Sequence, residues 1–437
     1  MAAANPPSEA NTMFFLALFK KLSEENTAGN IFFSPFSISS ALAMVMLGAK
    51  ANTATQMSEV LCFTKTKQPT EENQTQMMMQ SPMQMQIRTR EQMRIQLQHS
   101  SKLPLYLKKV LQRDDGEDDV HAHFQQLLTK FNKTSTGYTI SLANRLYGEQ
   151  TYTFDKGFLE ETRKYYQAEL ESVDFKNNAE AARVNINNWV EEKTQGKIKD
   201  LLKKLKNDTR MVLVNAIYFK GKWNQQFKED LTVEAPFRVN KNDTKQVMMM
   251  HQDSKFNFNT IPELNCQVLE MPYEGKDLSM LIFLPNEIED DTTGLEKLER
   301  ELTYDTIMKS TQPDKMEIDV EVQVGLPRFK MEVTYNLEEI LISMGMVDAF
   351  DGDRSDFSGM SPADDLALSK VIHKAFVEVN EEGTEAAAAT AVIVVEITSV
   401  REPKVPKVFV ADHPFFFFIR HNPSKTILFA GQYTTPE

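Results

Sequence analysis

The chain has 437 residues, of which 41% are hydrophobic and 9% aromatic, so it can bury a large core and is not a wholly disordered protein. Its formal net charge of −13 argues against a protein that binds nucleic acid or an anionic membrane through a basic face. Only two cysteines are present, Cys62 and Cys266, which favours a reducing compartment and no disulfide.

The first predicted element is an amphipathic helix near the N-terminus. Its apolar residues recur at helical spacing: Phe14, Phe15, Leu18 and Leu22. The apolar run Met13–Phe19 is short, and Lys20 and Lys21 follow it, whereas a secretory signal peptide has its basic residues first. We therefore expect a cytoplasmic protein without a cleaved leader, and leave open its release by an unconventional route. No apolar run reaches the roughly 20 residues of a membrane span, so no membrane association is expected.

Residues 30–61 predict a short strand, a turn at Ser34-Pro35 and a helix. The composition then changes over residues 64–119, which contain QTQMMMQSPMQMQIRTREQMRIQLQ and end near DDGEDD. This stretch has no clean hydrophobic period, so we interpret it as a flexible insert rich in Gln and Met. A segment that binds a partner is the alternative, because KLPLYLKKVLQR is able to form an amphipathic turn or two.

Ordered patterns resume after the insert. Helical periods occur at residues 121–133, 156–170, 179–205 and 337–344. The run MVLVNAIY, residues 211–218, is continuously apolar and predicts a buried central strand. Strand patterns follow at residues 237–250, 266–271, 278–284, 318–324 and 329–333, and again from residue 408 onward. Helices gather early and strands late, which predicts an α+β fold with large, mostly antiparallel sheets.

We find no pattern of enzyme chemistry. None of the seven histidines has a metal-ligand spacing, and His121 and His123 are interpreted as surface residues of a helix. A G-x-S-x-G nucleophile turn, a phosphate-binding glycine-rich loop and a paired-cysteine zinc motif are all missing from the sequence. We expect no catalytic residues, no metal and no cofactor.

Residues 377–404, VEVNEEGTEAAAATAVIVVEITSVREPK, give conflicting local signals. The segment EAAAATA favours a helix, but AVIVVEITSV is rich in β-branched residues and favours a strand. Small residues dominate and few side chains are able to anchor a loop. Such a segment can change conformation at little cost. The alternative is a plain Ala-rich connecting helix, which explains neither the Val/Ile tail nor the placement of charge.

Several motifs, in order along the chain, resemble those of the serpin family. NEEGTEAAAAT, residues 380–390, resembles the hinge of the reactive loop in inhibitory serpins, and SKVIHKAFVEV before it resembles the strand that leads into the hinge. The other matching segments are NIFFSPFSISSALAMVMLGA, VNAIYFKGKW, LPRFKME and VFVADHPFFFFIRHNPSKTILFAGQ. The resemblance covers the chain apart from the insert. It is strongest to the ovalbumin-like intracellular clade.

The resemblance implies a serpin fold of about nine helices and three β-sheets with an exposed reactive loop. It implies a single domain over residues 1–437, with the insert at 64–119 and the hinge and reactive loop at 380–404. The implied function is suicide inhibition of a serine protease: the protease cleaves the loop, remains as an acyl-enzyme, and is distorted when the loop inserts into the main sheet. We expect a monomer and no nucleic-acid partner. A non-inhibitory serpin, or an interaction protein that works through the insert, are the alternatives.

Insertion as a strand imposes a period of two, because alternate side chains must face the core. The hinge comprises Gly383, Thr384, Glu385, Ala386, Ala387, Ala388, Ala389 and Thr390. Counted from Gly383, the inward set is Thr384, Ala386, Ala388, Thr390, Val392 and Val394. All of these are small or apolar, whereas Glu385 falls on the solvent side. A bulky charge at Thr384 is expected to stall insertion.

The family spacing from the hinge glycine places the reactive bond between Ile397 and Thr398. An aliphatic residue at this bond suggests an elastase-like or chymotrypsin-like target. The rival is Arg401, a bait for trypsin-like proteases, which the count from the C-terminal side favours. Cleavage after Arg401 lengthens the inserted strand and buries Glu396 partway along it, at a cost of several kcal/mol unless it is paired.

The resemblance also implies a set of supporting residues. Ser34, Ser37, Asn215 and His373 are expected to form a polar cluster under the main sheet, here called the latch, which lets the strands part. Trp223 is expected to pack where insertion begins. The alternative for each of these residues is an ordinary buried side chain without a role in sheet opening.

Overall fold

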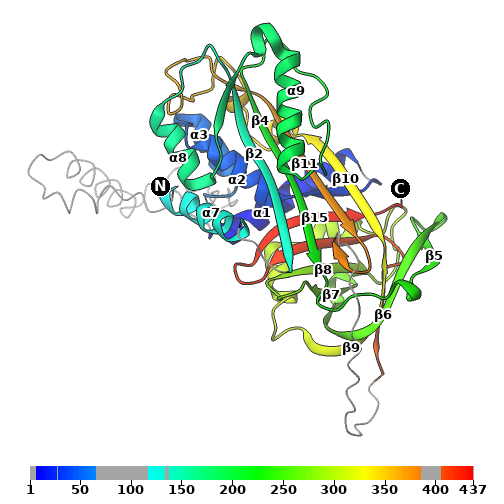
Figure 1. Ribbon diagram of the computed structural model, residues 1–437. Coiled ribbons are helices and arrows are strands. Elements are labelled where there is room, and N and C mark those ends of the chain that lie inside the picture. The colour runs from blue at the N-terminus through cyan, green and yellow to red at the C-terminus, as the bar shows by residue number, and fades with distance from the viewer. Residues whose placement is uncertain (1–5, 27, 65–116, 133–136, 385–404, 437) are drawn as a thin grey trace, which may run out of the picture.

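The computed structural model describes residues 6–26, 28–64, 117–132, 137–384 and 405–436 (Figure 1). Residues 65–116 of the expected insert and 385–404 of the expected reactive loop lie outside this part. The described helices are α1 (Pro7–Glu25), α2 (Pro35–Met46), α3 (Ala51–Val60), α7 (Glu117–Phe131), α8 (Lys156–Tyr166), α9 (Phe175–Lys193), α10 (Glu296–Glu301), α11 (Tyr304–Ser310) and α12 (Glu338–Ser343).

The described strands form two sheets. The six-stranded sheet has the order β10 (Phe329–Asn336), β11 (Leu368–Val379), β12 (Gly383–Thr384), β4 (Met211–Lys222), β2 (Tyr138–Glu149) and β3 (Leu170–Val173). The nine-stranded sheet has the order β1 (Ile31–Phe33), β15 (Thr426–Tyr433), β14 (Phe415–His421), β8 (Leu278–Pro285), β7 (Cys266–Pro272), β6 (Thr244–Ile261), β9 (Glu317–Pro327) and β13 (Lys407–Val410), with β5 (Val233–Arg238) paired to β6.

The family resemblance implies three sheets, whereas hydrogen bonding joins the described strands into two. The reason is β6, which is 18 residues long. Its first part pairs with β5, its middle with β9 and its last part with β7, so the two halves of the larger sheet are continuous. The α+β class is confirmed.

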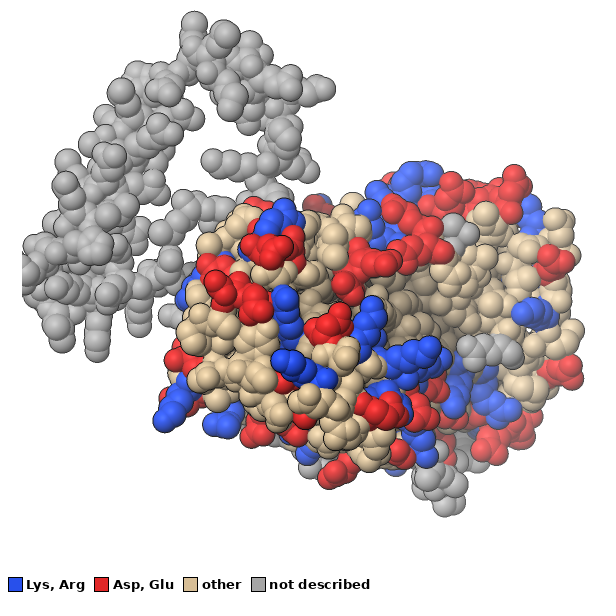
Figure 2. All heavy atoms as spheres, turned by 90° about the horizontal axis from the view of Figure 1, so that it is seen from above, with Lys and Arg blue, Asp and Glu red and all other residues tan. Residues whose placement is uncertain are grey.

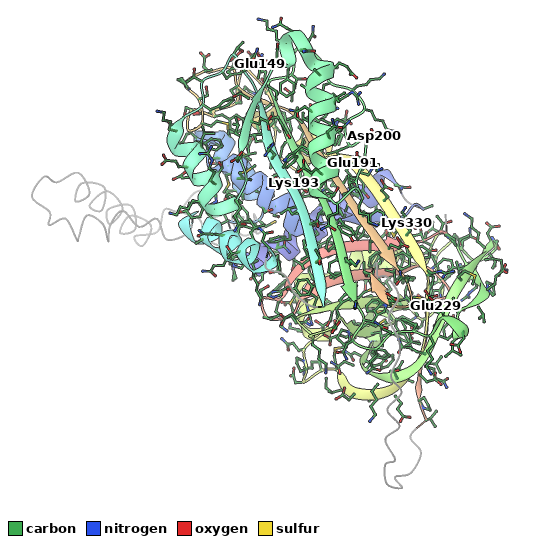
Figure 3. All side chains as sticks on the ribbon, viewed as in Figure 1. Glu149, Glu191, Lys193, Asp200, Glu229 and Lys330 are labelled. Atoms are coloured by element: carbon green, nitrogen blue, oxygen red, sulfur yellow. The ribbon has the colours of Figure 1, made fainter. Side chains whose placement is uncertain are left out.

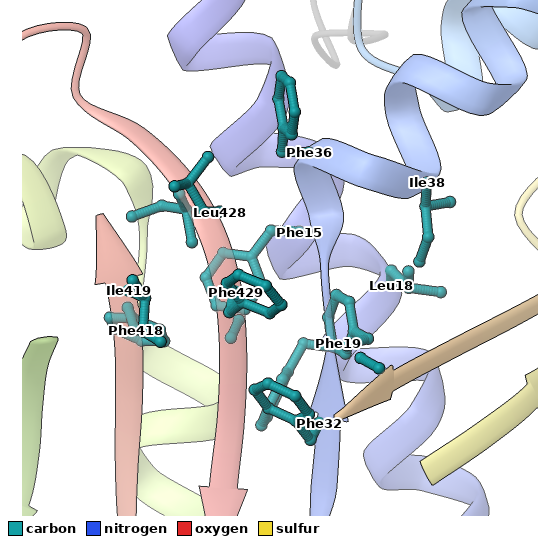
Figure 4. Packing of buried hydrophobic residues seen from close by; sticks show 14 of the residues in the cluster. Phe15, Leu18, Phe19, Phe32, Phe36, Ile38, Phe418, Ile419, Leu428 and Phe429 are labelled. Atoms are coloured by element: carbon teal, nitrogen blue, oxygen red, sulfur yellow. The ribbon is translucent and has the colours of Figure 1, made fainter. Parts of the chain in front are cut away.

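The main core lies where the two ends of the chain meet. Phe15 of α1 packs edge-on against Phe418 of β14, with ring centroids 5.2 Å apart, and Phe32 of β1 stacks on Phe429 of β15 at 5.5 Å (Figure 4). Every residue of α2 is buried, including its serines. Since a helix without a polar face must run inside the protein, α2 lies between the two sheets, beneath the centre of the six-stranded one.

Helix α9 covers the opposite face of the six-stranded sheet (Figure 1). Its first turn is capped twice: Asp174 accepts from the Asn177 N–H, and Glu149 at the end of β2 accepts from the N–H groups of Phe175 and Lys176 (Figure 3). Negative charge is favourable at this end of a helix. The main sheet is thus enclosed by α2 on one face and α9 on the other.

The helix predicted over 156–170 ends at Tyr166, and two other predicted boundaries differ further from the structure. The helix predicted over 179–205 ends at Lys193, because Gln195 and Gly196 take positive φ values of 56° and 76°. Leu202 is nevertheless buried, since the Asn187 side chain bonds both its N–H and its C=O. The strand predicted over 237–250 is divided by a turn into β5 and β6.

His121 was also predicted wrongly. It is 4% exposed, and its Nδ1 contacts the Tyr166 hydroxyl of α8. The neighbouring helix covers it, which the sequence of α7 alone does not reveal.

No disulfide joins Cys62 and Cys266. Within the described residues, no helix has the length and apolar composition that a bilayer crossing requires. On the face seen in Figure 2, acidic and basic side chains alternate in small groups.

Candidate functional site

The site is built on two strands that run in the same direction. β4 and β11 pair in parallel at the centre of the six-stranded sheet, from Leu368 opposite Met211 to Phe376 opposite Tyr218. The neighbouring pairs, β2 with β4 and β10 with β11, are antiparallel. A strand inserted between β4 and β11 can therefore pair with both of them in the antiparallel direction.

The chain begins to form that strand itself. After β11 it turns at residues 380–382, and β12 enters between β11 and β4. Thr384 lies opposite Val379 on one side and Gly221 on the other. Gly383 has a φ of 153°, and a Cβ placed there would lie 2.1 Å from the Gly221 carbonyl oxygen. Only glycine fits this position, since its backbone touches β4 directly.

Trp223 holds the turn from the β4 side. Its backbone N–H donates to the Glu382 carbonyl at 2.8 Å, and its indole Nε1–H donates to the Asn380 carbonyl at 3.1 Å. The indole stacks on Tyr273 with centroids 4.6 Å apart. Tyr273 in turn places its hydroxyl 2.9 Å from the Thr384 hydroxyl. Trp223 and Tyr273 therefore fix both the turn and the first residue that enters the sheet.

A charged group also anchors the turn. Glu381 is 5% exposed; its carboxylate accepts from the Thr232 hydroxyl at 2.7 Å and lies 3.4 Å from Nη1 of Arg328. Its carbonyl accepts from the Phe227 N–H at 2.8 Å. Because a buried carboxylate is costly without such partners, these contacts keep the turn in one position.

The four latch residues are brought together under the middle of β4 and β11. The Nδ1–H of His373 donates to Asn215 Oδ1 at 2.6 Å, and the Ser37 hydroxyl donates to the same oxygen at 2.7 Å. The Ser34 N–H donates to His373 Nε2 at 3.1 Å. The Asn215 amide donates to the Ser37 carbonyl at 3.2 Å, and the Ser34 hydroxyl donates to the Leu428 carbonyl at 2.5 Å.

This network determines the state of His373. Because Nε2 accepts from a backbone N–H, the proton of the neutral ring is on Nδ1. The side chain is fully buried, and desolvation lowers the pKa of His373 from 6.5 to about 3. Both hydrogen-bond partners of the ring, the Ser34 N–H and Asn215 Oδ1, are uncharged. The latch therefore joins β4, β11 and α2 through neutral hydrogen bonds at neutral pH.

The structure thus places Gly383, Thr384, Trp223 and the latch at the parallel pair. The remaining predicted residues lie outside the described part of the chain: Glu385, Ala386, Ala387, Ala388, Ala389, Thr390, Ile397, Thr398 and Arg401. Sequence reasoning missed Tyr273, Glu381 and Arg328. Glu381 and Arg328 stand in segments already singled out, NEEGTE and LPRFKME, but their pairing is visible only across the folded sheet. Tyr273 carries no sequence signal for its role.

The family follows from comparison with known sequences. A family model described as Serpin (serine protease inhibitor) matches residues 9–436. The chain belongs to the serpin family. It is 48% identical to the leukocyte elastase inhibitor of Sus scrofa over 98% of this chain and 99% of the relative, and 46% identical to that of Homo sapiens over the same shares. It is also 46% identical to serpin B4 of Homo sapiens over 99% of this serpin and 100% of the relative.

These relatives confirm the ovalbumin-like clade and the resemblance to leukocyte elastase inhibitor expected from the sequence motifs. Among solved structures, uncleaved ovalbumin matches this serpin with a TM-score of 0.77 at 32% identity, covering 99% of this chain and 100% of ovalbumin. The serpin fold expected from the sequence is therefore confirmed.

Proposed function

We propose that this serpin inhibits an elastase-like or chymotrypsin-like serine protease by a suicide-substrate mechanism. The observation that carries the proposal is β12, which already lies between the parallel strands β4 and β11. The names of the relatives, leukocyte elastase inhibitors, support an elastase-like target. Cleavage of the loop releases its far end, and the rest of the hinge then extends β12.

The register of β12 predicts what an extended strand meets. Since Thr384 is opposite Val379, continuing the antiparallel ladder brings Ala386 opposite Val377, Ala388 opposite Ala375 and Thr390 opposite His373. Directly opposed residues share a face of the sheet. The β11 residues on this face, Val377, Ala375 and His373, are buried, so the inward hinge residues would enter the core.

The gain from insertion is large enough to distort a protease. β11 is 12 residues long, and a strand of that length gains net hydrogen bonds of roughly 0.5–1.5 kcal/mol each. Hydrogen bonds then contribute on the order of 10 kcal/mol, and burial of Ala and Val side chains adds to this. The total is comparable with the stability of a folded protease, about 5–15 kcal/mol.

The length of β11 also supports Ile397 as the bait residue. A strand that ends level with Leu368 runs from Thr384 to Val395. The bond after Ile397 then lies just beyond the sheet, and a protease attached there is pulled tightly against the end of the molecule. With Arg401 as bait, the six residues after Val395, up to about 20 Å of extended chain, separate the protease from the sheet. In this register Glu396 lies beyond the sheet with either bait, so the distance to the protease, and not the burial of Glu396, favours Ile397.

The test is to mix the purified serpin with neutrophil-type elastase, chymotrypsin and trypsin, and to separate the products by electrophoresis in SDS. The expected result is a covalent complex with an elastase-like or chymotrypsin-like enzyme and release of a C-terminal fragment that starts at Thr398 by mass spectrometry. A fragment that starts at Glu402, formed with trypsin, would assign the bait to Arg401. Cleavage by all three enzymes without a complex would overturn the inhibitory function.

A further inference from the structure

Asn144 is a buried amide without hydrogen-bond partners. It lies on β2, is 8% exposed, and neither its Nδ2 nor its Oδ1 has a partner among the described residues. An unsatisfied amide in a core destabilises the state that contains it. Native proteins keep few such groups, so this one calls for an explanation.

The residue directly opposite explains why Asn144 has no partner. β2 and β4 lie side by side in the six-stranded sheet (Figure 1). Asn144 is directly opposite Asn215 in this antiparallel pair, so the two side chains lie on the same face of the sheet. Cβ atoms of such pairs are about 4.5–5.5 Å apart, within reach of two amides. The Asn215 Oδ1, however, already accepts from Ser37 and His373. A carbonyl oxygen has two lone pairs, so this acceptor is saturated.

Strand insertion removes one of these two donors. His373 is on β11 and Asn215 is on β4, and a new strand between them moves the two apart by about 4.8 Å, the spacing of neighbouring strands. Their 2.6 Å hydrogen bond cannot survive this separation. β2 and β4 are paired from Tyr138 to Gly148, so Asn144 moves together with Asn215 and remains opposite it.

We propose that Asn144 is a positioning residue for sheet opening: its Nδ2–H takes the place of His373 as a donor to Asn215 Oδ1 when the strand inserts. This rests on the proposed inhibitory function. The amide is unsatisfied in the uncleaved protein and satisfied after insertion. Asn144 therefore destabilises the uncleaved state and stabilises the inserted one, and widens the gap in stability that drives inhibition.

The test compares the thermal unfolding midpoints of the uncleaved and loop-cleaved forms for the wild type, Asn144→Leu and Asn144→Ala, in guanidinium so that both forms unfold in range. A loss of packing caused by the substitution lowers the midpoints of the uncleaved and the cleaved form alike, so it cancels in the difference between the two midpoints. We expect this difference to narrow by about 2–5 °C in both variants. Titration with the target protease should also show more serpin consumed per protease inhibited, because insertion is slower.

Asn187→Leu is the matched control. Asn187 is also a buried asparagine, 7% exposed, but its amide already bonds Leu202 in both directions. Its loss should lower both midpoints by similar amounts. If Asn144→Leu and Asn144→Ala behave in the same way as Asn187→Leu, the proposal for Asn144 is wrong. If the wild type itself gains no stability on cleavage, the inhibitory function fails instead, so the two failures are distinguishable.

Discussion

His373 couples the stability of the uncleaved serpin to pH. Its pKa is about 3 in the folded protein because of burial, against 6.5 for an exposed histidine. The folded state therefore binds a proton more weakly than the unfolded chain, so this contribution to stability is full above about pH 6.5 and falls as the pH drops toward 3. At pH 5 the loss is about 2 kcal/mol.

The measurement is the free energy of unfolding in urea between pH 7.5 and 4.5, for the wild type and His373→Gln. Glutamine offers a donor and an acceptor but does not titrate, so the variant should lose stability less steeply with falling pH. His421, whose pKa burial and Lys130 lower to about 4, contributes the same slope in both proteins. Parallel curves would show that His373 does not control this dependence.

At the scale of the element, the first inward side chain decides whether β12 can grow. The side chain of Thr384 points into the core and is 0% exposed to solvent. Thr384→Arg would bury an unpaired charge there, at a cost of several kcal/mol. We expect the variant to be cleaved by the target protease without a stable complex, as seen by electrophoresis in SDS.

The control for this variant is Glu385→Arg, which introduces the same side chain one position later, on the predicted solvent side. It should keep complex formation close to the wild-type level. Equal loss of inhibition in both variants would mean that charge in the loop, and not burial on the core face, is what matters, and the period of two would then be wrong.

Elements were predictable from sequence to the extent that local patterns determine them. MVLVNAIY gave β4 at its correct start, Met211, because a continuous apolar run can only be buried. The end of α9 was overestimated because Leu201 and Leu202 keep the apolar period without being helical. β12 has two residues and no pattern of its own, so only the resemblance to the family identified its segment. The Trp223–Tyr273 stack and the Glu381–Arg328 pair depend on strand register, which no local pattern encodes.

At the scale of the whole molecule, the two ends of the predicted insert are held close to the core. Phe63, just after α3, packs against Phe124 of α7 with centroids 6.1 Å apart, and Phe124 also contacts Phe36 of α2 at 5.9 Å. A short connection can therefore replace the residues between them. Loop-closure entropy changes slowly with length, so shortening this connection should alter stability by no more than about 1–2 kcal/mol.

We expect a serpin in which residues 65–116 are replaced by a short Gly/Ser linker to fold, to gain stability on loop cleavage, and to form the covalent complex at the wild-type rate. The contacts described above for the latch, the hinge turn and the β4–β11 pair join residues that this variant keeps. Thermal unfolding and the second-order rate constant of inhibition measure this. A variant that folds but loses inhibition would show that the insert takes part in recognition of the protease. The Gln/Met-rich composition of the insert does not predict such a role.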